Sequence, residues 1–280
     1  MKISVPLDRV IRQALIEDAA FRDITTNSLV PRDHRSSAVI FSKEEAVVSG
    51  VEIAKRVFTM LDGKAGVRFL VKDGQKIKKG QKVLTVQGRT RAVLSGERVA
   101  LNFLSYLSAI ATKTACFVTK VKPYKTWILD TRKTTPTLRF LERYAVRCGG
   151  GYNHRDDLAA MMMIKDNHRV AASGSIAQAV DRVYRKVDVA IEVEVDTWTQ
   201  LQDALQSRAD IILLDNMTPA MVKKAVKLRD QKAPSMLLEA SGGIDLSNVR
   251  QYARAGVDRI SVGELTHSRE AIDFSMEAVS

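Results

Sequence analysis

From about residue 125 to residue 262 the chain alternates short apolar runs with amphipathic stretches, and this rhythm limits the possible folds more than any other feature. Each run is short and largely apolar, and the stretches between the runs have the apolar spacing of helices. Buried apolar strands that alternate with helices are typical of a parallel sheet covered by helices. The predicted strands are 127–129, 161–164, 189–193, 211–214, 236–238 and 259–262, and the predicted helices are 137–147, 174–186, 198–208, 219–229 and 246–255.

The number of strand–helix units decides between the parallel folds. A complete eight-unit barrel takes about 250 residues, whereas only about 150 are present here for six units. A smaller, incomplete parallel α/β barrel is therefore expected, with an open doubly wound sheet as the alternative. The first hundred residues read as mixed helix and strand, with a helix over 6–19, strands within 37–48 and 67–86, and a long helix over about 95–121.

The charge is strongly positive and uneven. The chain has 44 Lys and Arg against 32 Asp and Glu, a net charge of +12; residues 1–170 carry 31 against 16, and residues 171–280 carry 13 against 16. Such a balance indicates nucleic acid, an anionic membrane surface or a small polyanionic substrate, and composition does not choose among them.

Other features of composition point to a cytoplasmic protein. No apolar run approaches the roughly 20 residues that a membrane span needs, and the first residues lack the pattern of a signal peptide. The two cysteines, Cys116 and Cys148, form neither a disulfide framework nor a metal-ligand spacing. A reducing, intracellular setting is expected.

Polar residues follow every predicted strand of the second half. In parallel α/β folds the active site lies at the carboxyl ends of the strands, so an enzyme site is expected at this rim. The residues concerned are Asp130-Thr131-Arg132-Lys133, Lys165-Asp166-Asn167-His168, Glu194 with Asp196, Asp215-Asn216, Glu239 with Ser241-Gly242-Gly243, and Gly263 with His267.

The chemistry of these residues indicates a polyanionic substrate and a divalent metal. Cations suited to carboxylates and phosphates are present at Arg132, Lys133, Arg155 and Lys165. Glu194 and Asp215 suit Mg²⁺ or sugar hydroxyls, and Ser241-Gly242-Gly243 before a helix offers backbone N–H groups to a phosphate. Taken singly, each has an ordinary reading as a surface ion pair or a turn, and the histidines lack the spacing of a zinc site.

The same residues resemble the quinolinate phosphoribosyltransferase family, in order along nearly the whole chain. The stretches that carry the resemblance are Ser95-Gly96-Glu97-Arg98-Val99-Ala100-Leu101-Asn102, Asp130-Thr131-Arg132-Lys133-Thr134-Thr135-Pro136, Arg147-Cys148-Gly149-Gly150-Gly151, Asn153-His154-Arg155, Ile164-Lys165-Asp166-Asn167-His168, Leu213-Leu214-Asp215-Asn216-Met217 and Glu239-Ala240-Ser241-Gly242-Gly243-Ile244.

The resemblance implies an α/β fold in two parts. An N-terminal α/β sandwich over 1–108 is completed by a C-terminal helix at about 269–280, and an incomplete α/β barrel over 109–268 is the catalytic domain. It also implies a homodimer or a larger homo-oligomer in which Arg98 of one subunit completes the other's site.

The resemblance also implies a role for each site residue. Arg132, Arg155 and Lys165 would bind the two carboxylates of quinolinate, assisted by Arg98 and His154, while Lys133 and His267 would meet the pyrophosphate of phosphoribosyl pyrophosphate. Glu194 and Asp215 would hold the ribose and Mg²⁺, and the amides around Ser241, Gly242, Gly243 and Gly263 the 5′-phosphate. Lys133, Lys165, Glu194 and Asp215 are the residues expected to be catalytic.

The implied reaction forms nicotinate mononucleotide, pyrophosphate and CO₂ in NAD biosynthesis. One departure from the family pattern follows Asn153-His154-Arg155, where Gly-Leu and an acidic residue are usual and this chain has Asp156-Asp157-Leu158-Ala159-Ala160. This bears on the substrate, and a related enzyme of the molybdenum-transport-linked type is the alternative.

Two other classes of protein remain. A nucleic-acid-binding protein would account for the charge, but the sequence has no recognised binding motif and no basic stripe interleaved with aromatic residues. A carrier-type hairpin is suggested by residues 73–83, although the usual setting of an attachment lysine is missing. We expect neither nucleic acid nor a membrane as a partner.

Overall fold

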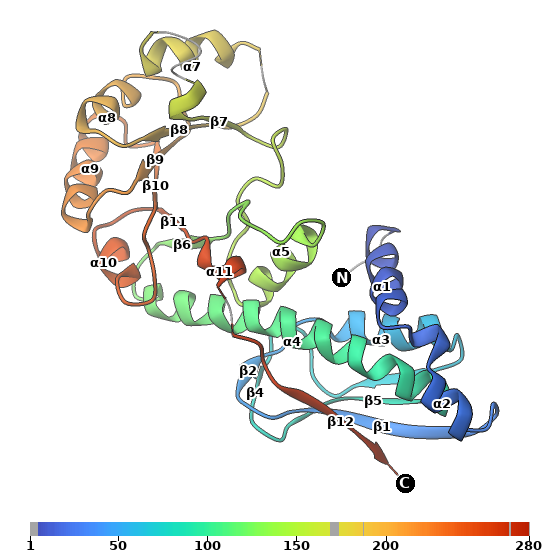
Figure 1. Ribbon diagram of the computed structural model, residues 1–280. Coiled ribbons are helices and arrows are strands. Elements are labelled where there is room, and N and C mark those ends of the chain that lie inside the picture. The colour runs from blue at the N-terminus through green and yellow to red at the C-terminus, as the bar shows by residue number, and fades with distance from the viewer. Residues whose placement is uncertain (1–4, 169–173, 187, 269, 280) are drawn as a thin grey trace. The chain divides into compact units, whose positions relative to one another are not determined.

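The computed structural model describes residues 5–168, 174–186, 188–268 and 270–279, and the chain packs as two compact units (Figure 1). The N-terminal unit comprises residues 1–113, 136–150 and 268–280, and the barrel unit comprises 114–135 and 151–267. The segment 136–150, which the sequence places between the first two strands of the barrel, therefore packs with the N-terminal unit. Inside that unit the hydroxyl of Tyr144 donates to Asp73 at 2.6 Å.

The N-terminal unit is built on a four-stranded antiparallel sheet in the order β12-β1-β5-β3. A separate two-stranded pair joins β2 and β4. The strands are β1 (Arg35–Ser42), β2 (Ala46–Val47), β3 (Gly66–Phe69), β4 (Lys76–Ile77), β5 (Lys82–Arg89) and β12 (Phe274–Val279), and the helices are α1 (Val5–Glu17), η1 (Ala20–Arg22), α2 (Ile24–Leu29), α3 (Val51–Leu61), α4 (Thr90–Val121) and α5 (Arg139–Cys148).

The predicted C-terminal helix is wrong, because the last described segment is the strand β12. It pairs antiparallel with β1 from Ser42↔Phe274 to Ser37↔Val279. Without this segment β1 would have an unpaired edge, and backbone groups at such an edge need hydrogen-bond partners. The C-terminal residues therefore do join the N-terminal sheet, but as a strand.

Local rules explain the first helices. Leu7, Ile11 and Leu15 recur every four residues on α1 and are all buried, as the apolar spacing predicts. Asp73 accepts the backbone N–H groups of Gly50 and Val51 at the start of α3, at 2.8 and 3.1 Å. The turn that resembled part of a carrier hairpin thus has a structural task here.

Helix α4 is long and apolar enough to cross a membrane on length and composition alone, but half of its most apolar window is buried inside the protein. Leu104, Leu107 and Ile110 are completely buried. This burial is typical of a core helix.

The barrel unit contains six parallel strands in the order β6-β11-β10-β9-β8-β7. The order follows the chain from β7 to β11 and then returns to β6, as in a barrel that lacks closure between its first two strands. In a doubly wound sheet the order of the strands would reverse at an internal strand. The strands are β6 (Trp127–Leu129), β7 (Met162–Ile164), β8 (Ile191–Val195), β9 (Ile211–Asp215), β10 (Leu237–Ser241) and β11 (Arg259–Ser261).

The helices α7 to α10 lie along the outer side of this curved sheet (Figure 1). The incomplete parallel α/β barrel is thus confirmed. The side chains of Ser175, Thr197 and Thr218 cap α7, α8 and α9 by accepting hydrogen bonds from backbone N–H groups in the first turn of each helix. The bounds are α7 (Ile176–Tyr184), α8 (Trp198–Ala204), α9 (Pro219–Lys232), α10 (Val249–Arg254) and α11 (Glu264–His267).

Candidate active site

A cavity of about 860 Å³ lies at the carboxyl ends of the barrel strands. Arg98 is exposed on α4 in the N-terminal unit and is not among the described residues that line it. The other residues predicted for the site all line this cavity: Arg132, Lys133, His154, Arg155, Lys165, Glu194, Asp215, Ser241, Gly242, Gly243, Gly263 and His267. The structure thus brings them together, while their individual roles stay predictions.

Two arginines give the cavity an anion-binding wall. Burial and the neighbouring Arg132 cation both lower the pKa of Arg155. The Nε atom of Arg132 is buried and has no hydrogen-bond partner among the described residues. Two cations held close together, one with an unused N–H group, favour a ligand with more than one negative charge.

Two carboxylates, Glu194 and Asp215, line the same cavity. Lys165 forms an ion pair with Glu194. Burial and the charge of Glu194 raise the pKa of Asp215, whose Oδ2 accepts a hydrogen bond from the Asn216 side chain at 2.8 Å. A raised pKa in a carboxylate beside another carboxylate means that this end of the cavity attracts further positive charge.

The loop after β10 depends on glycine. Gly242 has φ +90°, and a Cβ at this position would lie 2.2 Å from Asn216 Oδ1. Gly243 also has a positive φ, of +61°. Only residues without a side chain fit here comfortably, and the backbone consequently lies open toward the cavity. This geometry suits close approach of a phosphate to the backbone.

The side chains of Lys133 and His267 both lie beside Gly263. A Cβ on Gly263 would lie 3.0 Å from His267 Nε2 and 3.2 Å from Lys133 Cδ. The hydroxyl of Thr266 donates to the Lys133 carbonyl at 2.7 Å and ties the two loops together. A second pair of basic side chains is thereby held at the β6–β11 side of the cavity.

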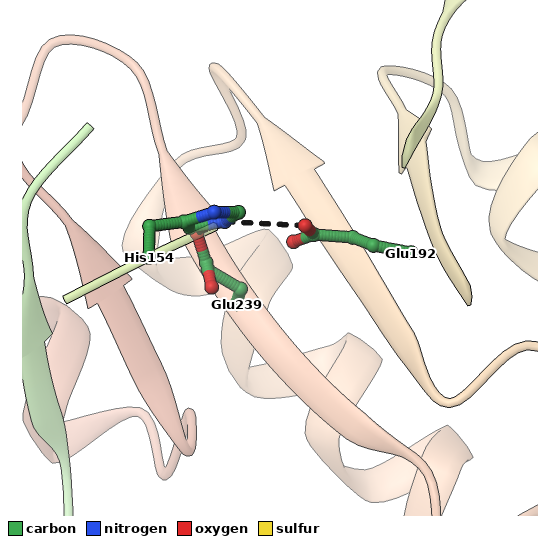
Figure 2. Close-up of side chains that lie close together, drawn as sticks. All are labelled: His154, Glu192 and Glu239. Atoms are coloured by element: carbon green, nitrogen blue, oxygen red, sulfur yellow. Dashed lines mark ion pairs between the residues drawn. The ribbon is translucent and has the colours of Figure 1, made fainter. Parts of the chain in front are cut away.

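His154 lies deeper, between two glutamates (Figure 2). Its Nε2 is 3.1 Å from Glu192 Oε2 and 3.2 Å from Glu239 Oε1, and both glutamates are completely buried. Arg259 Nη1 lies 3.9 Å from the other oxygen of Glu239. We refer to His154, Glu192, Glu239 and Arg259 as the floor of the cavity.

The floor retains an additional proton. Burial lowers the pKa of His154, but the two carboxylates raise it more, to about 10. Burial and the charge of Glu239 raise the pKa of Glu192. Both directions mean one proton beyond a neutral imidazole and two carboxylates. Because Nδ1 of His154 accepts the Arg155 backbone N–H at 2.7 Å, this proton lies on the Nε2 side, shared with the carboxylates.

The segment that carries His154 is fixed to β6. Tyr152 forms a parallel bridge to Leu129, and its backbone exchanges hydrogen bonds with Ile128 and Asp130 at 2.8 and 3.1 Å. The buried carboxylate of Asp130 accepts the His154 N–H at 2.7 Å and the Asn153 side chain at 2.5 Å. Asp130 therefore holds in place the loop that leads to Arg155.

Sequence reasoning missed Glu192 and Arg259 and gave Glu239 no role. The available indication was alternation along the strand, since residues two apart point to the same face. Glu192 lies two residues before Glu194, and Glu239 lies two residues before Ser241. Each pair places one group at the rim and another one step deeper in the barrel.

Two groups of residues could hold a metal ion. Glu194 and Asp215 at the rim are carboxylates near open space, which suits Mg²⁺. The ligand atoms of His154, Glu192 and Glu239 lie within 4.8 Å of one another. In the floor, however, the shared proton and Arg259 already balance the two negative charges, so the rim pair is the better match.

Fold and cavity together define an α/β-barrel enzyme that binds a polyanionic substrate at the carboxyl end of its strands. Residues 110–277 match the model of the quinolinate phosphoribosyl transferase C-terminal domain, and residues 23–108 match that of its N-terminal domain. The chain belongs to the quinolinate phosphoribosyltransferase family.

Individual relatives agree over nearly the full length. The chain is 43% identical to nicotinate-nucleotide pyrophosphorylase [carboxylating] of Mycobacterium leprae, covering 95% of each. It is 41% identical to a probable enzyme of the same name from Bacillus subtilis, covering 97% of this chain and 93% of the relative. The structure of nicotinate-nucleotide pyrophosphorylase from Francisella tularensis superposes with a TM-score of 0.93 at 37% identity, covering 99% and 98%.

Proposed function

We infer that the chain catalyses the transfer of a phosphoribosyl group to quinolinate, forming nicotinate mononucleotide, pyrophosphate and CO₂ in NAD biosynthesis. The observation that carries this inference is a single cavity that gathers cations from the ends of β6 and β7, carboxylates from β8 and β9, and a glycine loop from β10. Quinolinate carries two carboxylates, and phosphoribosyl pyrophosphate carries phosphates at both ends of a sugar. Binding the two substrates together requires cations for the carboxylates and phosphates, carboxylates for the ribose, and an open backbone loop for a phosphate.

In the first step the pyridine nitrogen of quinolinate bonds to C1 of the ribose as the bond from C1 to the pyrophosphate oxygen breaks. Arg132, Arg155 and Lys165 hold the carboxylates and orient the nitrogen toward C1. Positive charge develops on the sugar, where Glu194 and Asp215 stabilise it. Negative charge develops on the departing pyrophosphate, where Lys133 and His267 stabilise it.

In the second step the carboxylate beside the ring nitrogen leaves as CO₂. The bond from C2 to the carboxylate breaks, its electron pair stays on C2, and a proton then adds to C2. The positive charge of the pyridinium nitrogen formed in the first step stabilises that electron pair on C2, so the protein supplies position and charge and needs no covalent intermediate.

We propose Mg²⁺ as the metal, held by Glu194 and Asp215 together with the substrate's oxygens. When bound, it would neutralise negative charge on the departing pyrophosphate. The raised pKa of Asp215 beside Glu194 supports a cation at this place. In the structure the Lys165 ammonium gives Glu194 its counter-charge.

We also propose that the enzyme works as a homodimer or larger oligomer in which Arg98 completes the partner's cavity. Leu94, 40% exposed, lies four residues before Arg98 and hence on the same face of α4. Ser95 donates to Asp23 at 2.9 Å, which places the start of α2 beside this face, and Ile24 there is 81% exposed. Exposed apolar residues around a functional arginine support an interface between subunits.

The cytoplasm is the proposed location, with neither nucleic acid nor a membrane as a partner. The small anionic substrates account for the cations that line the cavity. A paralogous transferase with another acceptor is the second candidate. The departure at residues 156–160 motivates it, but these residues are exposed and none is among the described residues lining the cavity.

The test is to mix purified protein with quinolinate, phosphoribosyl pyrophosphate and Mg²⁺ and to measure nicotinate mononucleotide and CO₂. Equal amounts of both products are expected. Product from nicotinate with none from quinolinate would replace the proposed function with that of another phosphoribosyltransferase. Omitting Mg²⁺ should abolish the reaction.

A further inference from the structure

The floor of the cavity contains buried charge that the reaction scheme leaves without a task. Glu192 and Glu239 have no exposed surface, and their carboxylates lie 3.1 and 3.2 Å from His154 Nε2. Burying two carboxylates costs free energy unless their partners compensate for the lost water. The residue that contacts both glutamates, His154, therefore indicates what role they have.

The side chain of His154 connects the floor to Arg155 in the anion-binding wall. Nε2 of His154 faces the two carboxylates, while Nδ1 accepts the backbone N–H of Arg155 at 2.7 Å. An imidazole can accept at Nδ1 and donate at Nε2 only in the tautomer that carries its proton on Nε2. Glu192 and Glu239 select this tautomer, because a carboxylate accepts hydrogen bonds and favours the protonated nitrogen.

The tautomer in turn affects the position of Arg155. The Arg155 side chain is also held where Nη1 donates to the Met161 carbonyl at 3.2 Å. If the proton moved to Nδ1, two N–H groups would face each other at the Arg155 backbone and the loop would have to shift. A bidentate grip on a carboxylate needs its guanidinium within a few tenths of an ångström, so such a shift would weaken it.

We propose that Glu192 and Glu239 are positioning residues that hold His154 in its Nε2–H tautomer and thereby hold Arg155 in register for the substrate carboxylate. This proposal rests on the proposed function, since it assigns the carboxylate to quinolinate. Neither glutamate touches the substrate in this arrangement. Their effect is confined to the binding of quinolinate and does not extend to the binding of phosphoribosyl pyrophosphate.

The electrostatic surroundings of His154 agree with this assignment. Among the described residues, Glu192 from β8 and Glu239 from β10 face it, with Arg259 behind Glu239, and Asp130 holds its backbone at the end of β6. The Arg259 cation, 3.9 Å from Glu239, reduces the cost of keeping the carboxylates charged. The positioning role therefore needs no metal ion in the floor.

Steady-state kinetics of Glu192→Gln and Glu239→Gln test the proposal, with both substrates varied. Each variant should raise KM for quinolinate roughly tenfold or more, as expected for a lost hydrogen bond to a charged group, with little change in KM for phosphoribosyl pyrophosphate. Equal changes in both KM values, or no change in either, would overturn it. Wild-type turnover of quinolinate, measured alongside, tests the proposed function separately.

Asp258→Asn is a matched control for general destabilisation of the barrel unit. Asp258 pairs with the buried Arg229 at 2.7 Å and is not among the described residues that line the cavity. Its loss should lower the melting temperature and leave both KM values unchanged. If this variant also raises KM for quinolinate selectively, the effect is one of stability and the positioning role is wrong.

Nitrogen-15 NMR of the wild-type imidazoles tests the tautomer without any change to the floor. The chain has only four histidines, so single substitutions assign each signal. His154 should show a protonated Nε2 and an unprotonated Nδ1 at neutral pH. The opposite tautomer, an imidazolium with both nitrogens protonated, or a stoichiometric transition metal bound at Nε2 would each overturn the proposal.

Discussion

The rim and the floor of the barrel are built from the same strands but differ in almost every physical respect. At the rim, Glu194 and Lys165 are partly exposed and pair with each other. At the floor, two residues deeper on β8, Glu192 is completely buried and faces His154. Rim groups can exchange partners when a ligand arrives, whereas floor groups keep theirs. One strand can therefore supply both a binding group and the group that fixes its neighbours.

The largest effect is expected for Arg98 and Lys165, which are proposed to touch the substrate from different subunits. Arg98→Ala should be folded and nearly inactive, and Lys165→Ala likewise, each with a loss of about a hundredfold to a thousandfold in kcat/KM. Mixing the two should restore up to about a quarter of wild-type activity, because half of randomly formed dimers are mixed and each has one intact site. Recovery of nothing, after subunit exchange has been demonstrated, would place Arg98 in no shared site.

The rim carboxylates come next. Glu194→Gln and Asp215→Asn should each lower kcat about a hundredfold and weaken the Mg²⁺ dependence, while the dissociation constant for quinolinate stays nearly unchanged. Asp196→Asn is the control, since Asp196 is exposed just after β8 and is not among the described cavity-lining residues. Full activity in both rim variants would show that the metal site is wrongly assigned.

A smaller effect is expected at the glycine loop. Gly242→Ala would bring a Cβ to 2.2 Å from Asn216 Oδ1 and should raise KM for phosphoribosyl pyrophosphate by about tenfold through the displaced loop. Gly243→Ala shares the positive φ but has no heavy atom within 4 Å of its new Cβ. A comparison of the two variants separates the steric clash from backbone strain; equal behaviour would argue against the clash.

The rim was predictable from the sequence, and the floor was not, for a physical reason. Lys133, Lys165 and Asp215 interrupt or follow apolar runs, where a change from apolar to polar residues is easy to see. Glu192 lies inside a strand that otherwise reads as core, and its partner His154 is 38 positions away in the sequence. Such a pairing depends on tertiary structure, which propensity and periodicity do not contain.

The C-terminal segment shows a related limit. Residues Phe274–Val279 have no pattern that decides between helix and strand, and the edge of β1 decides the outcome by supplying hydrogen-bond partners. In contrast, the helices and parallel strands of the barrel were predictable within a few residues, because each follows a long local pattern.

The weakest effect concerns stability against pH. Despite burial, Glu192 and Glu239 raise the pKa of His154 from an ordinary 6.5 to about 10 in the folded protein. Because Nδ1 accepts the Arg155 N–H, the proton that the folded state binds more tightly lies between Nε2 and the two carboxylates of the floor. Its stabilising contribution is complete below pH 6.5 and is lost as the pH rises to about 10, with a slope of up to about 1.4 kcal/mol per pH unit. Urea denaturation at several pH values should show this decline, and His154→Gln should flatten it. An unchanged slope in that variant would contradict the assignment.

A double-mutant cycle on quinolinate binding shows whether the floor acts on the substrate through Arg155. Calorimetry would give the dissociation constant for wild type, Glu239→Gln, Arg155→Gln and the double variant. If the floor acts only by positioning Arg155, the double variant should bind no more weakly than Arg155→Gln alone. Additive losses, in which Glu239→Gln weakens binding equally with and without Arg155, would show that the floor does not act through Arg155.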